Sequence, residues 1–151
     1  MKREETKQIR AMEDIGDILL LPSTLRELER NILVNLCLAQ QPLTTADVKK
    51  MKGNAFFQIK GAYNTLDLAL TRLERDGYVI KKKEGVGLKK KRAYEFWYVD
   101  PYFFQKWHKT RAEIMHEVAK TPKELRQELY PASTFLFFGI HITAKNAGVT
   151  R

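Results

Sequence analysis

Apolar positions repeat with the period of an α-helix in the first half of the chain. From Leu25 onward they lie three or four residues apart, which predicts an amphipathic helix over residues 25–39. Pro22 predicts a break just before this helix, and Ser23 or Thr24 is placed to cap its first turn. The sequence therefore indicates that the first core helix starts after a proline break.

A short second helix is expected over residues 46–52. Thr44 or Thr45 is suited to its N-cap, Asp47 favours its first turn, and Gly53 closes it. A third helix follows within residues 61–77.

The third helix has the clearest amphipathic pattern of the three. Leu66, Ala69, Leu70 and Leu73 line one face, polar and basic residues line the other, and Gly77 is placed to end it in a left-handed conformation.

After this helix the period changes from 3.6 to 2, which is typical of strands. Residues 78–82 and 92–99 are expected to form two strands, with residues 83–91 as a long connecting loop. In the second strand Phe96 and Trp97 fall on opposite faces. The pattern predicts a β-hairpin with a basic tip.

A longer helix is expected directly after the hairpin. Asp100 suits an N-cap and Pro101 a first helical position, and an apolar stripe continues to about residue 119. Pro122 ends this helix, and a short helix over residues 123–129 follows.

Three helices followed by a basic hairpin predict an α+β, mainly helical fold of the winged helix-turn-helix type, with flanking helices at both ends. The predicted organisation is an N-terminal helical arm (1–22), a winged-helix DNA-binding domain (23–99), C-terminal helices (100–142) and a flexible tail (143–151).

The charge balance indicates a polyanionic partner. The 151 residues include 27 Lys and Arg against 18 Asp and Glu, a formal net charge of +9. Nucleic acid is the first candidate and an anionic membrane surface the second. No apolar stretch is long enough to span a bilayer, and no signal peptide is expected. The single cysteine, Cys37, is expected in the core, and the protein is expected to be cytoplasmic and nucleoid-associated.

Seven cations crowd the hairpin around one acid, Glu84, and like charges on a short loop favour a polyanion. They are Lys81, Lys82, Lys83, Lys89, Lys90, Lys91 and Arg92. A solvated basic face or a localisation signal is the alternative interpretation.

The polar face of the third helix carries residues suited to base edges and phosphates. Asn can bond adenine, Thr can meet a phosphate or a thymine methyl, and Arg can reach guanine. We expect Asn64→Ala and Arg72→Ala to weaken DNA binding. Outside the hairpin, the expected contact residues are Thr45, Lys60, Tyr63, Asn64, Thr65, Asp67, Thr71 and Arg72, with Arg75 further along the same polar side.

Two segments resemble known families. Residues 63–85, YNTLDLALTRLERDGYVIKKKEG, resemble the recognition helix and wing of winged helix-turn-helix regulators of the MarR and PadR types. Residues 92–118, RAYEFWYVDPYFFQKWHKTRAEIMHEV, are similar to the winged-helix domain in the large subunit of transcription factor E, although the cysteine pairs of its zinc ribbon are missing. The first resemblance implies a homodimer on a palindromic operator, with the terminal helices as dimer contacts.

Apolar residues beyond the hairpin are candidates for that dimer interface, because uncovered apolar surface often marks one. For the cluster FLFFGI (135–140), packing on its own domain is an equal alternative. The candidates are Phe103, Phe104, Trp107, Ile114, Met115, Phe135, Phe137 and Phe138.

The sequence favours a sequence-specific transcriptional regulator that binds double-stranded DNA. Phosphate-loop, GxSxG and HExxH motifs are absent, the three histidines are not spaced to share a metal, and neither catalysis nor a cofactor is expected. A small-molecule effector stays open. The main alternative is a winged-helix protein-interaction module of a transcription or replication assembly, and a third is RNA or single-stranded DNA stacking on aromatic residues.

Overall fold

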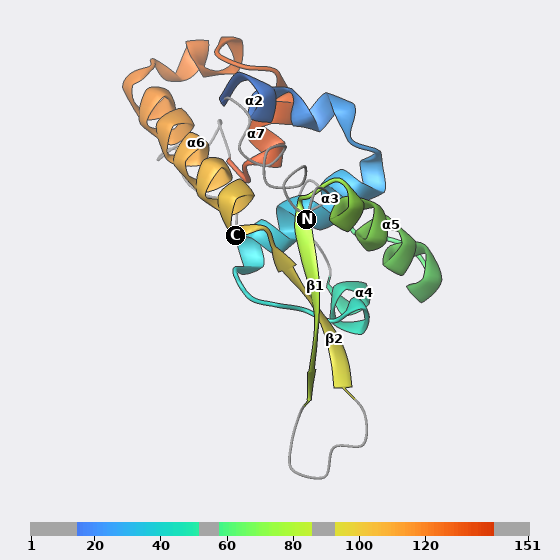
Figure 1. Cartoon of the computed structure of the whole chain (residues 1–151). Helices are drawn as coiled ribbons and strands as arrows, with labels where there is room; N and C mark the ends of the chain where they lie inside the picture. The colour runs from blue at the N-terminus through green and yellow to red at the C-terminus, as the bar shows by residue number, and fades with distance from the viewer. Residues whose placement is uncertain (1–14, 52–57, 86–92, 141–151) are drawn as a thin grey trace.

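Residues 15–51, 58–85 and 93–140 are described by the structure, a computed structural model (Figure 1). The described chain is an α+β fold, mainly helical, with a two-stranded antiparallel hairpin that follows the first helices, which confirms the predicted class at this level. In chain order the elements are α2 (Ile15–Thr24), α3 (Glu27–Ala39), α4 (Thr45–Lys50), α5 (Tyr63–Arg75), β1 (Val79–Gly85), β2 (Ala93–Val99), α6 (Pro101–Lys120), the 3₁₀ helix η1 (Lys123–Glu128) and α7 (Ala132–Phe137).

Helix α3 is the central element and matches the first predicted helix except at its start. Every residue from Asn31 to Cys37 is buried, so this stretch packs on all sides. The amide nitrogens of its two buried asparagines are hydrogen-bonded, since Asn31 Nδ2 donates to the Gln58 carbonyl (3.0 Å) and Asn35 Nδ2 donates to the Asn31 carbonyl (2.6 Å). Helix α3 therefore packs against α5 and β2 as well as against α7.

The predicted break at Pro22 and Ser23 is wrong, because both residues lie inside α2. The hydroxyls of Ser23 and Thr24 donate to carbonyls three residues earlier, at 2.9 and 3.2 Å, and the N-cap of α3 is Arg26. A proline inside a helix costs about 3 kcal/mol. Burial of α2 offsets that cost, since Ile18 and Pro22 are both buried.

Helix α4 starts with a reciprocal cap, which confirms Thr44 among the two predicted threonines. The Thr44 hydroxyl accepts from the Asp47 amide, and the Asp47 carboxylate accepts from the Thr44 amide, both at 3.0 Å. Lys49 and Lys50 occupy the last turn, where cations complement the helix dipole. These local interactions hold a helix of only six residues.

Helix α5 confirms the third predicted helix. Its apolar residues Leu66, Ala69, Leu70 and Leu73 are all fully buried. Gly77 follows with a φ of +91°, a conformation that side-chain-bearing residues rarely adopt. The chain therefore turns sharply from α5 into the hairpin.

Strands β1 and β2 pair in antiparallel register from Val79 opposite Val99 to Gly85 opposite Ala93. The first strand runs three residues beyond its predicted end at Lys82, because Glu95 and its neighbours extend the ladder on the facing strand. Figure 1 shows this hairpin projecting from the helical body beside α4.

Trp97 is paired on both edges of β2. It lies opposite Lys81 of β1, and on the other edge it exchanges two backbone hydrogen bonds with Leu43: Trp97 N donates to Leu43 O (2.7 Å) and Leu43 N to Trp97 O (3.1 Å). The segment before α4 thus acts as a short third edge of the hairpin.

A single residue, Asp100, joins β2 to α6 and confirms the predicted N-cap. Its amide donates to the Tyr78 carbonyl (2.9 Å), and its carboxylate accepts from the Phe103 amide (2.9 Å). Burial raises the pKa of the Asp100 carboxyl, and hydrogen bonds from the Phe103 and Tyr102 amides partly offset that rise. Pro101 fills the first helical position.

The end of α7 is tied to α6 by two side chains. Trp107 Nε1 donates to the Phe137 carbonyl (3.2 Å), and Arg111 Nε donates to the Phe138 carbonyl (2.7 Å). The Trp107 and Phe138 rings stack with centroids 5.7 Å apart. Burial lowers the pKa of the Arg111 guanidinium. Arg111 therefore caps the C-terminal end of α7.

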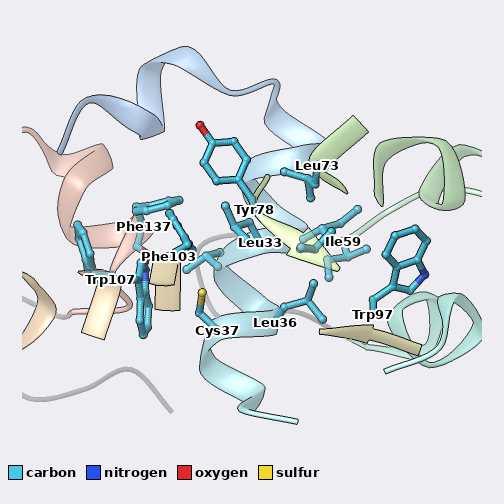
Figure 2. Packing of buried hydrophobic residues seen from close by; sticks show 14 of the residues in the cluster. Leu33, Leu36, Cys37, Ile59, Leu73, Tyr78, Trp97, Phe103, Trp107 and Phe137 are labelled. Carbon is cyan, nitrogen blue, oxygen red and sulfur yellow. Dashed lines mark hydrogen bonds between the residues drawn. The ribbon is translucent and has the colours of Figure 1, made fainter. Parts of the chain in front are cut away.

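One continuous core joins the described helices and strands other than η1, which has no buried residue. In Figure 2, α3 contributes Leu33, Leu36 and Cys37 between a group around Trp97 and a group around Trp107. The two groups also meet through Tyr78 and Phe103, whose rings pack edge to face at 5.3 Å.

The proposed dimer-interface residues require a correction. Phe104 and Met115 are partly buried, and the other six are at most 2% exposed within one chain, so they fill its core and form no surface for a second copy. Of the two alternatives for the FLFFGI cluster, the structure shows packing within its own chain. The six buried residues are Phe103, Trp107, Ile114, Phe135, Phe137 and Phe138.

Cys37 is fully buried, as predicted, and burial raises the pKa of its thiol well above the ordinary value. Since the thiolate is the reactive form, we expect iodoacetamide to leave the native protein unlabelled and to modify it readily in urea. Mass spectrometry reads this directly, because the chain has one cysteine. Rapid labelling of the native protein would contradict the burial.

Candidate nucleic-acid interface

A ridge of four exposed side chains runs along α5 directly opposite its buried face. Its members, called here the α5 ridge, are Asn64, Leu68, Thr71 and Arg75. They lie four, three and four residues apart, so each is about one helical turn from the next. The three polar members are predicted from the sequence, whereas Leu68, which is 56% exposed, is not. Leu68 could have been predicted from its position four residues after Asn64, which places both side chains on the same face of the helix.

Exposed residues also surround the start of α5. Lys60 precedes the helix, and Tyr63 and Thr65 lie in its first turn, all three exposed as a contact surface requires. The N-cap is Ala62, whose side chain satisfies no amide of the first turn. Helix amides in this position carry partial positive charge and suit a phosphate oxygen.

Thr45 and Asp67 do not belong to an exposed contact surface. Thr45 is 4% exposed; its hydroxyl accepts from Trp97 Nε1 and donates to Asp67 Oδ1, both at 2.9 Å. The predicted DNA contact by Thr45 is therefore wrong, and Asp67 is engaged with α4. Thr71 stays exposed, although its hydroxyl donates to the Asp67 carbonyl at 2.8 Å. This Trp97–Thr45–Asp67 chain fixes the hairpin and α4 against α5.

Arg72 also has a structural partner. Its Nε lies 2.5 Å from Oε2 of Glu29, whose side chain is only 6% exposed, and Arg26 Nε lies 4.0 Å from the same oxygen. The Arg72 side chain is 21% exposed. Arg72 therefore balances a buried carboxylate of α3, and the expected DNA contact at this partly exposed residue stays a prediction.

The cations of β1 are less crowded than the sequence suggests. Glu95, which sequence analysis did not count, lies between two of them: Lys81 Nζ is 3.8 Å and Lys83 Nζ 3.9 Å from its carboxylate. Lys81 also lies over the Trp97 ring, 5.3 Å from the centroid. Lys83 remains largely exposed, with 72% of its side chain accessible.

The opposite face of the hairpin carries Lys82 over the Tyr98 ring, 5.3 Å from the centroid, and Tyr98 donates a hydrogen bond to Glu84. This bond is the largest cause of the raised pKa of Tyr98. The expected contacts Lys89, Lys90, Lys91 and Arg92 lie outside the described residues.

Helix α5, α4 and the base of the hairpin lie together at one side of the molecule (Figure 1). The first turn of α5 and the α5 ridge are exposed, and the exposed Lys82 and Lys83 lie further along β1, beyond the base of the hairpin. Thr45, which is hydrogen-bonded to Trp97 and to Asp67, connects α4 with β2 and α5, whereas Arg72 connects α5 with α3.

Comparisons with models of protein families, with characterised proteins and with solved structures found nothing that matches the chain. Within the described ranges, no three His, Cys, Asp or Glu side chains gather as a metal site would require. The helices of these same ranges include none with the length and apolar character needed to cross a membrane.

Proposed function

We propose that the chain is a sequence-specific transcriptional regulator that binds double-stranded DNA as a winged helix-turn-helix protein. The observation that carries the proposal is the α5 ridge: a helix face on which an amide, a leucine side chain, a hydroxyl and a guanidinium follow one another about one turn apart, with no acidic member. The major groove admits a helix, and these groups can pair with base edges and phosphates.

The order of the elements supports the winged-helix assignment. Helices α3, α4 and α5, with the bridge at Leu43 between the first two, lead into the hairpin β1–β2, which takes the place of the wing. Lys82 and Lys83 are exposed on it, and a wing places such cations against flanking phosphates.

A homodimer on a two-fold symmetric operator stays part of the proposal, supported by the resemblance to MarR-type and PadR-type regulators. Its contacts must lie outside the six side chains that are buried in the core. Light scattering of the protein with and without operator DNA measures this directly.

The test is duplex binding across a salt series, with intact protein and a variant carrying Lys89→Ala, Lys90→Ala and Lys91→Ala. Each neutralised phosphate adds about 0.9 to the slope of log affinity against log salt. We expect steep salt dependence for the intact protein and a slope shallower by about 2 to 3 for the variant.

A charge-matched control carries Lys109→Ala, Lys120→Ala and Lys123→Ala, three exposed residues of α6 and η1. It loses the same net charge far along the chain from the hairpin, so its slope should stay close to that of the intact protein. Failure of the intact protein to bind duplex DNA at low salt would overturn the proposal.

The half-exposed aromatic row on one face of β2 favours a second candidate, a protein-interaction module. Tyr94 is 48% exposed, Phe96 and Tyr98 are partly exposed, and Tyr98 also lines a groove of about 290 Å³ with Pro42 and Phe104. Under this alternative, Tyr94→Ala would abolish partner binding, whereas the lysine variant would have little effect.

A further inference from the structure

We propose that Leu68 determines sequence specificity by contacting the C5-methyl group of a thymine in the major groove. The inference rests on the proposed DNA-binding function and deepens it, because it names the feature of the duplex that this helix reads. It assigns a role to the one member of the α5 ridge that cannot form a hydrogen bond.

The position of Leu68 supports this role. The side chain points away from the buried face, because Leu66 and Leu70, two residues before and after it, are fully buried while Leu68 is 56% exposed. Asn64 lies one turn before it and Thr71 one turn after it, both exposed. In any groove-bound orientation that brings these two residues to the DNA, Leu68 lies between them.

The chemistry of the groove supplies a matching partner. Among the groups that the four base pairs present in the major groove, the thymine methyl is the apolar one, and apolar side chains contact it. Contact would remove the exposed leucine surface from water, which is favourable.

Asn64, one turn before Leu68 on the ridge, further specifies the base sequence that the helix would bind. Asn64 can form two hydrogen bonds with adenine. One helical turn advances about 5.4 Å, compared with about 3.4 Å per base pair, so the two side chains reach bases one or two steps apart. The expected site therefore has an adenine and a thymine within about two base pairs.

The experiment begins by enriching duplexes from a random-sequence pool with the intact protein. In the enriched duplex each thymine is then replaced singly by deoxyuridine, which removes only the methyl group. We expect one or two replacements to weaken binding about five-fold, and the Leu68→Ala variant to bind the thymine and uracil duplexes equally well. A double-mutant comparison of this kind separates the contact from any change in the DNA itself.

Leu125→Ala is the matched control, because Leu125 is similarly exposed (50%) but lies in η1. It should keep the full five-fold difference. If duplexes enrich but no uracil replacement weakens binding, or if Leu68→Ala retains the difference, the role of Leu68 is refuted while DNA binding stands. If no sequence enriches at all, both the inference and the proposed function fail.

Discussion

Arg72→Ala is expected to lower the free energy of unfolding by about 3 kcal/mol. The change leaves the Glu29 carboxylate, 6% exposed, with Arg26 at 4.0 Å as its remaining ion-pair partner among the described residues. Removing one partner of a buried ion pair typically costs about 3 to 5 kcal/mol, and the partial exposure of Arg72 places this case at the lower end. Urea denaturation followed by circular dichroism measures the change.

The control is Arg75→Ala in the last turn of the same helix, where the side chain is 63% exposed. This variant should change stability by less than about 0.5 kcal/mol. The double variant Arg72→Leu with Glu29→Met should recover much of the loss, since it removes both charges together. Equal stability of Arg72→Ala and Arg75→Ala would show that the Glu29 pair contributes nothing.

Trp97→Ala is expected to be the more damaging substitution, with a loss of about 4 kcal/mol. The indole is completely buried, and its Nε1 donates to Thr45, which in turn donates to Asp67. Truncating a buried tryptophan leaves a cavity and costs about 3 to 5 kcal/mol. The Thr45 hydroxyl also loses its donor. The same denaturation experiment measures this loss.

Tyr94→Ala provides the comparison on the same strand, because Tyr94 is 48% exposed. It should cost less than about 1 kcal/mol. A small effect of Trp97→Ala would mean that the hairpin does not depend on its indole for attachment to α4.

Features set by near neighbours in sequence could be predicted. The Thr44 cap, the apolar face of α5, the left-handed Gly77 and the cap at Asp100 each depend on residues within about four positions, and the structure has all of them. Pro22 shows the limit of local rules. Its preference for a helix break is real, but packing of α2 against α6 and α7 outweighs it.

The candidate site was harder to predict, because which side chains are free to bind depends on distant partners. Arg72 and Thr45 are equally plausible DNA contacts from sequence, yet Glu29 lies 43 positions from Arg72 and Trp97 lies 52 positions from Thr45. Glu95 escaped notice because only the strand register places it beside Lys83. Leu68 was overlooked since chemistry, rather than exposure, guided the choice of candidates.

The single-residue connection at Asp100 has a mechanical consequence. Asp100 alone separates β2 from α6. It is hydrogen-bonded to the carbonyl of Tyr78, which follows the turn after α5, and to the first turn of α6. A helix of 20 residues is about 30 Å long, so α6 extends far beyond this junction. Because no loop separates the two elements, any change in the angle between β2 and α6 must be accommodated at Asp100 itself.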